Sequence, residues 1–339
     1  MNKNKFDIFF AASPLHLICV NEYRRIKGIE NFKLILLLHK ENKHALKQMY
    51  QTLEILDFKK YHIFWIPKNN LIRFLNELIL IFRLKLNNLK NNYRFLIIDF
   101  RNTFMHSLRR FFKYSEFILI DDGFYTIVAY DKFISKNIFL PNSSYRYTRG
   151  VITKFLYFGN SYKRILKSPI KIFTIYADEI IGKTDKIIGK NIVMNNLYEL
   201  RKNINFENIK FIDKKVFFTG TRMVEKGALK LEEELELIIA ARNYWNKKGK
   251  VMYYVGKRST SKEKLLTFNK KGINTLQFDL PLEIVFTQIQ EIPAHICGLG
   301  STLQKSLKLL FRENITCYYV DLYEFFKKSN NNILKIKKK

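Results

Sequence analysis

The sequence contains little cysteine: Cys19, Cys297 and Cys317 are the three cysteines in 339 residues. Each lies within an apolar run, and none has a partner at the spacing of a metal-ligand motif. Secreted domains with small cores depend on dense disulfides, and zinc motifs need clustered cysteine or histidine. We therefore expect no disulfide framework and no metal site, and a cytoplasmic location.

The sequence also lacks a long apolar run that is free of charge. A bilayer-spanning helix needs about 20 predominantly apolar residues, and the longest apolar segment, residues 71–89, contains one acidic and three basic side chains. The N-terminal stretch KFDIFFAAS is interrupted by Asp7. It is more typical of a buried strand than of a signal peptide.

Acidic residues are scarce, with 30 Asp and Glu against 60 Lys and Arg, a formal net charge of +30. Such a balance favours anionic partners, either nucleic acid or an anionic membrane. The basic residues are spread along the whole chain among many Asn, Ile and Phe. An AT-rich genome also produces this amino-acid bias, so the excess of Lys is not by itself a sign of an anionic partner. Because no zinc finger, RNP-like segment or basic zipper is present, we expect no nucleic-acid partner, and nucleic-acid binding remains only a second alternative.

Apolar runs alternate with helical periodicity along the first half of the chain. Strands are predicted at residues 7–13, 32–38, 61–65, 95–98 and 117–120, with helices at 41–56, 72–89 and 103–112. Alternating strands and helices imply crossover connections and a mostly parallel sheet that is covered on both faces. The first half is therefore predicted to be an α/β domain.

The second half repeats this scheme after an irregular polar stretch near residues 202–215. Strands are predicted at residues 216–219, 251–255, 273–278, 294–297 and 315–320, with helices at 228–245, 262–268, 282–289 and 301–311. We expect two α/β domains, over 1–205 and 206–325, and a polybasic tail over 326–339. Ligands of open α/β sheets bind beyond the carboxyl ends of the strands, so the residues that follow each strand are the candidates for a site.

Two adjacent acids, Asp121 and Asp122, follow a predicted buried strand and precede Gly123. A carboxylate at a strand end suits a general base, and a neighbouring like charge or partial burial raises the pKa of one of the two. The alternative is an ordinary strand-ending turn, because Asp-Gly is common in turns. Asp99 and Arg101 follow another strand and are predicted to support the acids. Ser13 forms the turn before the first helix and joins this supporting group.

Three glycine clusters follow strands of the second half. They are Gly220-Thr221-Arg222, Gly256-Lys257-Arg258 and Gly300-Ser301-Thr302. Backbone N–H groups at a strand-helix junction bind phosphate, and Lys257 and Arg258 add positive charge. The alternative for Ser301 is a plain helix cap. Glu283 lies in the first turn of a predicted helix. Its carboxylate either interacts favourably with the positive end of the helix dipole or accepts hydrogen bonds from ribose hydroxyls.

Taken in order, these motifs resemble the bacterial lipooligosaccharide sialyltransferase family, which is related to the bacterial polysialyltransferases. The segments that carry the resemblance are SPLHLICVNEY, IIDFRNTFMHSL, LIDDG, FFTGTRMVEKG, YYVGKRST, FDLPLE and IPAHICGLGSTLQKSL. The resemblance implies a GT-B fold, in which two Rossmann-like domains with parallel sheets face a central cleft, and no metal or other cofactor. It also implies a CMP-sialic acid donor bound by the nucleotide-sugar domain over 206–325 and a glycan or glycolipid acceptor bound by the acceptor-side domain over 1–205, with Asp122 as general base. Glu283 would hold the ribose, and Ser301 and Thr302 the donor phosphate.

The sequence departs from the family at Gly256, where a histidine that assists departure of the nucleotide is expected. Either Lys257 or Arg258 neutralises the leaving phosphate instead, or the donor is not CMP-sialic acid, or activity is weak or lost. A fixed cation can stabilise a leaving phosphate electrostatically, so we favour the first two readings together. A UDP-hexose-dependent transferase of the same fold is the first alternative. His16 is predicted to be a capping or surface residue, and His295 a packed structural residue.

Residues 71–90 form a basic amphipathic pattern that fits either a core helix or a helix lying on an anionic leaflet. The lysines of residues 327–339 form a polybasic end, and each cation near such a surface contributes about 1 kcal/mol. We therefore expect a peripheral protein on the inner face of the cytoplasmic membrane.

Overall fold

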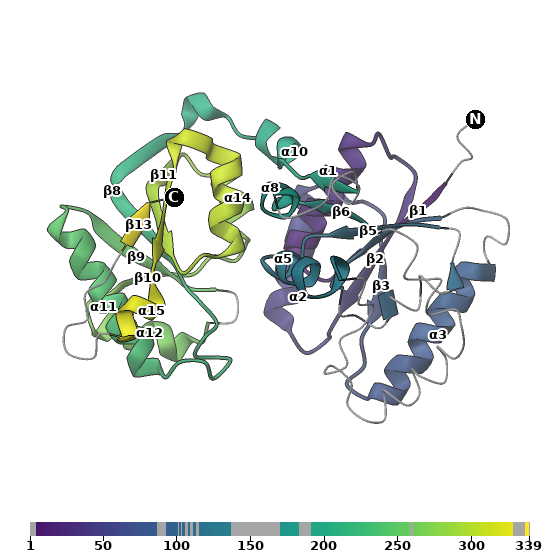
Figure 1. Cartoon of the computed structure of the whole chain (residues 1–339), viewed down its shortest axis with the longest axis horizontal. Helices are drawn as coiled ribbons and strands as arrows, with labels where there is room; N and C mark the ends of the chain where they lie inside the picture. The colour runs from purple at the N-terminus through teal and green to yellow at the C-terminus, as the bar shows by residue number, and fades with distance from the viewer. Residues whose placement is uncertain are drawn as a thin grey trace. The chain divides into compact units, whose positions relative to one another are not determined.

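The computed structural model describes residues 5–86, 93–100, 102, 104–105, 108, 111–112, 115–136, 170–182, 191–257, 260–327 and 336–338 (Figure 1). Within these residues the chain forms two compact units, Met1–Asn196 and Leu197–Lys339. The change of unit falls a few residues before the expected boundary at 205. The first predicted helix pattern beyond residue 100, at 103–112, lies largely outside the described residues.

The first unit contains a seven-stranded sheet in the order β3-β2-β1-β4-β5-β6-β7, with every pair parallel. Its strands are β1 (Phe6–Ala11), β2 (Phe32–Leu38), β3 (His62–Trp65), β4 (Tyr93–Ile97), β5 (Glu116–Ile120), β6 (Lys171–Thr174) and β7 (Ile192–Met194). Its helices are α1 (Pro14–Ile26), α2 (Lys43–Ile55), α3 (Asn70–Leu86), α5 (Tyr125–Ala129) and α8 (Ala177–Ile181), with a π-helical turn at Tyr130–Ile134.

The interior strand β1 is apolar from Ile8 to Ala11, where both of its faces are covered. Residues 8–11 are fully buried, as is typical of parallel sheets with helices on both faces. The strand order reverses between β1 and β4, which are neighbours although two other strands separate them in the sequence. A reversal of this kind opens a crevice at the carboxyl ends of the two strands, where ligands of doubly wound sheets bind.

The second unit contains a six-stranded sheet in the order β10-β9-β8-β11-β12-β13. Its strands are β8 (Lys210–Thr219), β9 (Val251–Val255), β10 (Asn274–Leu276), β11 (Glu291–Gly298), β12 (Thr316–Val320) and β13 (Ile336–Lys338). Its helices are α10 (Tyr198–Lys202), α11 (Leu231–Lys247), α12 (Lys262–Lys270), α13 (Leu282–Gln288), α14 (Thr302–Phe311) and α15 (Leu322–Lys327), with short 3-10 turns at Phe206–Asn208 and Arg312–Asn314.

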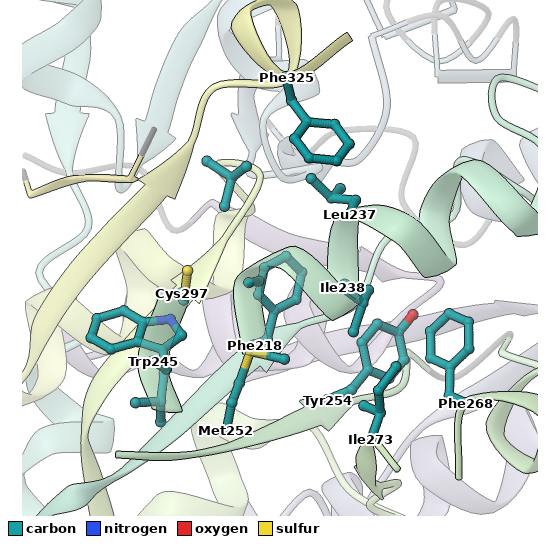
Figure 2. Packing of buried hydrophobic residues seen from close by; sticks show 13 residues of the cluster. Phe218, Leu237, Ile238, Trp245, Met252, Tyr254, Phe268, Ile273, Cys297 and Phe325 are labelled. Atoms are coloured by element: carbon teal, nitrogen blue, oxygen red, sulfur yellow. The ribbon is translucent and has the colours of Figure 1, made fainter. Parts of the chain in front are cut away.

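The core of the second unit is built where α11 and α12 meet the sheet (Figure 2). Trp245 of α11 lies beside Cys297 of β11, while Tyr254 of β9 packs against Phe218 and Phe268. All five side chains are at most 1% exposed. At about 25 cal/mol per Å² of buried apolar surface, large aromatic side chains of this kind are major contributors to the stability of the unit.

The two predicted α/β halves with mainly parallel sheets are confirmed, and most predicted strands lie within a residue or two of their observed bounds. Two details were wrong. The stretch near 202–215 is not irregular throughout, because β8 begins at Lys210. The segment 326–339 does not end as a free tail, because Ile336–Lys338 forms β13 and pairs antiparallel with β12. In the described part of the chain, no helix has the length and apolar character needed to cross a bilayer.

Candidate active site

Asp121 and Asp122 follow β5 and precede a turn that only a residue such as glycine adopts easily. Gly123 has a φ of 66°, in the left-handed region that costs an L-residue energy. The turn leads directly into α5, and the backbone N–H of Asp122 donates to the hydroxyl of Thr126 at 3.1 Å. The chain therefore changes from strand to helix directly after the two acids, and both acids lie at the carboxyl edge of the sheet.

Asp121 is the structural member of the pair. Its carboxylate is fully buried, accepts a hydrogen bond from the Thr174 hydroxyl, and accepts a second from the backbone N–H of Ile175 at 2.8 Å. Burial raises the pKa of Asp121 from its ordinary 3.8 to about 7, although both hydrogen bonds act in the opposite direction. Asp121 therefore ties the end of β5 to the end of β6 and does not face solvent.

Asp122 is the accessible member, and it faces a buried histidine. The Asp122 side chain is 31% exposed, and its Oδ1 lies 3.6 Å from Nε2 of His16. The backbone N–H of Ala12 donates to Nδ1 of His16 at 3.1 Å, so the neutral ring carries its proton on Nε2. At 3.6 Å from Oδ1 of Asp122, Nε2 is close enough for electrostatic attraction but makes no hydrogen bond within the described residues.

His16 owes its position to the start of α1. The Ser13 hydroxyl caps this helix by accepting the N–H of His16 at 3.3 Å, and Pro14 occupies the first turn. The ring is 4% exposed, so the surface alternative was wrong, whereas the contact of Nδ1 with the Ala12 N–H, next to the helix cap at Ser13, agrees with the capping alternative. His16 follows β1 and Asp122 follows β5, on either side of β4. The pair thus lies beside the reversal point of the first sheet, where ligands of such sheets bind.

The predicted supporting residues have more limited roles. Ser13 supports the site through the helix cap. Asp99 follows β4 with a φ of 44°, and its carbonyl accepts the N–H of Asn102 at 2.9 Å, which makes it a turn residue. Arg101 lies outside the described residues. Thr174 and Thr126 were missed because a single hydroxyl on a strand or helix gives no signal in the sequence.

In the second unit, Gly220 and Gly256 do not offer free amides. The N–H of Gly220 donates to the Val255 carbonyl and that of Gly256 to the Leu276 carbonyl, each at 2.8 Å. A Cβ at Gly220 would lie 2.6 Å from the Tyr254 hydroxyl, so glycine is required there by close packing. The sheet already uses these two amides, so phosphate binding at the two junctions stays a prediction that depends on other donors. Arg258 lies outside the described residues.

The start of α14 is closed in a similar way. Gln304 is fully buried, and its Oε1 accepts the N–H groups of both Gly300 and Ser301 at 3.0 Å. Its amide nitrogen donates to the carbonyl of Tyr318 at 2.9 Å. The two predicted phosphate-binding amides therefore serve the helix cap. The Ser-x-x-Gln spacing is a capping-box signature and would have identified Gln304 from the sequence.

The charged candidates of the second unit do lie near one another. Burial lowers the pKa of Lys257, and the like charge of Arg222 lowers it further, while Glu283 acts in the opposite direction. Burial raises the pKa of Glu283, which is 8% exposed, and Lys257 lowers it. Lys257, Arg222 and Glu283 thus share one electrostatic environment. Thr221 contacts the buried pair of Glu234 and Lys264, whose Oε2 and Nζ atoms are 2.6 Å apart.

His295 confirms its predicted structural role. Its ring stacks on Trp245 with a centroid distance of 5.9 Å, and its Nε2 lies 2.8 Å from Oδ1 of Asp213. Among the described residues, no three His, Cys, Asp or Glu side chains gather in a way that would hold a metal ion.

No protein-family model matches the sequence, and no curated protein sequence matches it. Solved structures do. A putative UDP-N-acetylglucosamine 2-epimerase from Listeria monocytogenes superposes with a TM-score of 0.53 at 12% identity, over 89% of this chain and 76% of that one. A second UDP-N-acetylglucosamine 2-epimerase gives 0.49 at 14% identity, over 91% and 77%. The E. coli ADP-heptose lipopolysaccharide heptosyltransferase II gives 0.37 at 10% identity, over 93% and 83%.

At this level of identity, similarity to a solved structure establishes the fold alone. The Listeria protein matches across both α/β units, and each unit of the present chain has the strand order of a Rossmann-like sheet. The chain therefore has a two-unit α/β fold of the GT-B type.

Proposed function

We propose that this chain is a glycosyltransferase that moves a sialic acid, or a related Kdo-type sugar, from a CMP-sugar to a hydroxyl of a cell-surface glycan such as lipooligosaccharide or capsule. The observation that carries the proposal is the Asp122–His16 pair, a partly exposed carboxylate held against a buried histidine beside the reversal point of a Rossmann-like sheet. The GT-B fold supports it, since this fold is shared by enzymes that act on nucleotide sugars.

In the proposed reaction Asp122 is the general base. The acceptor hydroxyl oxygen forms a bond to the anomeric carbon as the bond to the CMP oxygen breaks, and CMP departs with the electron pair. The hydroxyl proton passes to Asp122. We assign a positioning role to the buried His16 ring, whose Nε2 lies 3.6 Å from Oδ1 of Asp122.

On the donor side, we assign charge neutralisation of the leaving phosphate to Lys257, with help from Arg222. A cation that is partly desolvated interacts more strongly with a developing charge than one in water does. Lys257 follows Gly256, where the related families are expected to carry a histidine. Glu283 for the ribose, and the hydroxyls of Ser301 and Thr302 for the phosphate, stay part of the proposal. In this role the serine and threonine would act through side chains, because Gln304 occupies the nearby amides.

A UDP-hexose donor is the second candidate. The protein from Listeria is described as a UDP-N-acetylglucosamine 2-epimerase, and its fold matches along most of this chain. A pocket for a uridine diphosphate sugar is therefore compatible with the same architecture.

A donor screen tests the proposal. The purified chain is incubated with CMP-sialic acid, CMP-Kdo or UDP-sugars and truncated lipooligosaccharide, and the acceptor mass and released nucleotide are measured. We expect acceptor mass gain with CMP release, unaffected by a metal chelator. Asp122→Asn should lower the rate at least about a hundredfold, whereas Asp178→Asn, an exposed acid of the same unit, should not. Transfer from UDP donors alone would contradict the CMP proposal in favour of the second candidate.

A further inference from the structure

Helix α3 presents a continuous apolar stripe to solvent. Its members recur every three or four residues and are between 48% and 70% exposed: Leu71, Ile72, Leu75, Ile79, Phe82 and Leu86. This spacing places all six side chains on one face of the helix. Soluble proteins rarely expose contiguous apolar patches of this kind unless the patch binds something.

The opposite face of α3 is a normal core face. Ile81 and Leu84 are buried, and Glu77 is buried with its carboxylate 2.8 Å from the Arg73 guanidinium. Glu77 is the one acidic residue in the sequence of the helix. The two sequence alternatives, a core helix and a surface-binding helix, thus describe opposite faces of the same helix.

Basic side chains border the exposed stripe. With 3.6 residues per turn, Arg83 lies along one edge of the stripe and Lys85 along the other, and both residues are exposed. Long basic side chains in such positions reach the headgroups of anionic lipids while their stems and the apolar stripe enter the acyl boundary. A second copy of the same face would bring these cations together, which disfavours self-association through α3.

We infer that α3 is a membrane-docking helix, which lies flat in the interface of an anionic bilayer with Leu71, Ile72, Leu75, Ile79, Phe82 and Leu86 inserted. The net charge of +30 attracts the whole chain to such a surface. The basic residues of 327–339 are less suited to this role than the sequence suggested, because Ile336–Lys338 is part of the sheet. The inference does not depend on the proposed reaction, although a lipid-anchored acceptor would be presented at the same surface.

Vesicle cosedimentation of the full chain tests the inference. We expect binding to vesicles of phosphatidylethanolamine and phosphatidylglycerol that weakens with salt and is much weaker on pure phosphatidylcholine. Ile79→Ser with Phe82→Ser should weaken binding about tenfold or more. The matched control is Leu266→Ser, because Leu266 is 58% exposed on α12 of the second unit, and it should bind like the wild type.

The basic border is tested separately. Arg83→Gln with Lys85→Gln should weaken binding to the anionic vesicles about tenfold to thirtyfold at low salt, whereas Lys247→Gln with Lys248→Gln should change it far less. An equal loss in this control pair would show attraction by net charge alone and would overturn the role of α3.

A conservative variant keeps the test valid if the serine variants do not fold. Phe82→Trp should show a blue-shifted emission with anionic vesicles and quenching by brominated lipids, relative to the wild type. No shift and no quenching would contradict insertion. Stripe variants that change the molecular mass in solution but not vesicle binding would show that the occupant is a second copy. Vesicle binding without any transferase activity would contradict the proposed function alone.

Discussion

Two neighbouring acids have different environments because successive side chains at a strand end point to opposite sides. Asp121 points into the protein between β5 and β6, where it is fully buried, and Asp122 points to the edge beside His16. The sequence placed both at a strand end and assigned both to catalysis. Because of these different environments, Asp121 is a positioning residue and Asp122 is the candidate base.

The buried Asp121 carboxyl predicts a pH-dependent stability. Its pKa is raised from 3.8 to about 7 in the folded chain, so between these values the folded state binds more protons than the unfolded state does. The stabilising contribution is complete below about pH 4 and is lost as the pH rises through about 7, by up to a few kcal/mol. Asp121→Asn resembles the protonated acid. We expect it to gain stability relative to the wild type between about pH 5 and pH 8 in urea unfolding.

Asp178→Asn is the control, because Asp178 is exposed. The difference in unfolding free energy between this variant and the wild type should be the same at about pH 5 and at about pH 8. A loss of stability in Asp121→Asn that does not change with pH would contradict a raised pKa at Asp121.

The two ring nitrogens of His16 have separable roles. Nδ1 accepts the Ala12 N–H and supports the fold, whereas Nε2 faces Asp122. His16→Asn keeps an acceptor near the Nδ1 position, so it should fold normally but lose about tenfold to a hundredfold in kcat, because it removes the Nε2 group that lies 3.6 Å from the Asp122 carboxylate. His16→Gln keeps a donor near the Nε2 position, so it should retain more activity but unfold more easily. The measurements are kcat, KM and Tm for both variants. The reverse order of activities would contradict the positioning role.

At the level of elements, the glycines after the strands of the second unit show that one sequence motif fits two different roles. Glycine, a basic residue and a hydroxyl at a strand end predict a phosphate site, yet a strand end that passes close to its neighbour also requires glycine. Gly220 lacks room for a Cβ beside Tyr254, and Gln304 fills the start of α14. Only the positions of neighbouring chains distinguish the two cases.

Gln304 is expected to stabilise the second unit through α14. Gln304→Ala would leave the N–H groups of Gly300 and Ser301 and the Tyr318 carbonyl without this buried partner. A lost cap and unsatisfied buried groups together cost about 2–4 kcal/mol. The loss should appear as a lower free energy of unfolding in urea. Gln288→Ala, at the exposed end of α13, should cost less than about 0.5 kcal/mol. Equal losses would indicate that the capping contacts contribute nothing.

At the level of the whole molecule, the alternation of strands and helices was sufficient to predict two parallel α/β units. Central strands such as β2 and β9 were predicted to the residue, because strands buried on both faces are continuous apolar runs. The short strands β6, β7 and β13 were missed, although β3 and β10, which are equally short, were predicted, because three or four residues give only a weak periodic signal. Strand order and the antiparallel pairing of β13 are not encoded in local pattern at all.

Removal of residues 328–339 should therefore act on stability and not only on charge. The truncation deletes β13 and exposes the edge of β12, which is paired to it over Tyr318–Val320. An exposed edge strand is a template for aggregation. We expect a lower midpoint of urea unfolding and increased light scattering on heating. The triple variant Lys337→Gln, Lys338→Gln and Lys339→Gln keeps the strand and should unfold and scatter light like the wild type. If it loses as much stability as the truncation, the loss of charge and not the loss of β13 is the cause.

The candidate site divides in the same way between sequence and structure. The acidic pair was identified from the sequence because it follows an apolar strand and precedes a glycine, both of which are local signals, and the family resemblance selected Asp122 as the candidate base. Its partner His16 was not, because the two residues are 106 positions apart in the sequence and nothing around His16 marks it as buried.

The strand-helix alternation by itself determined that the chain is a two-unit α/β protein, since burial and periodicity are local properties of sequence. The tertiary structure alone decided which of two acids is accessible, which glycine amides are already bonded, and which face of α3 is left in solvent. These depend on residues that meet only when the sheets assemble, where close packing and burial set each group's partners and its pKa.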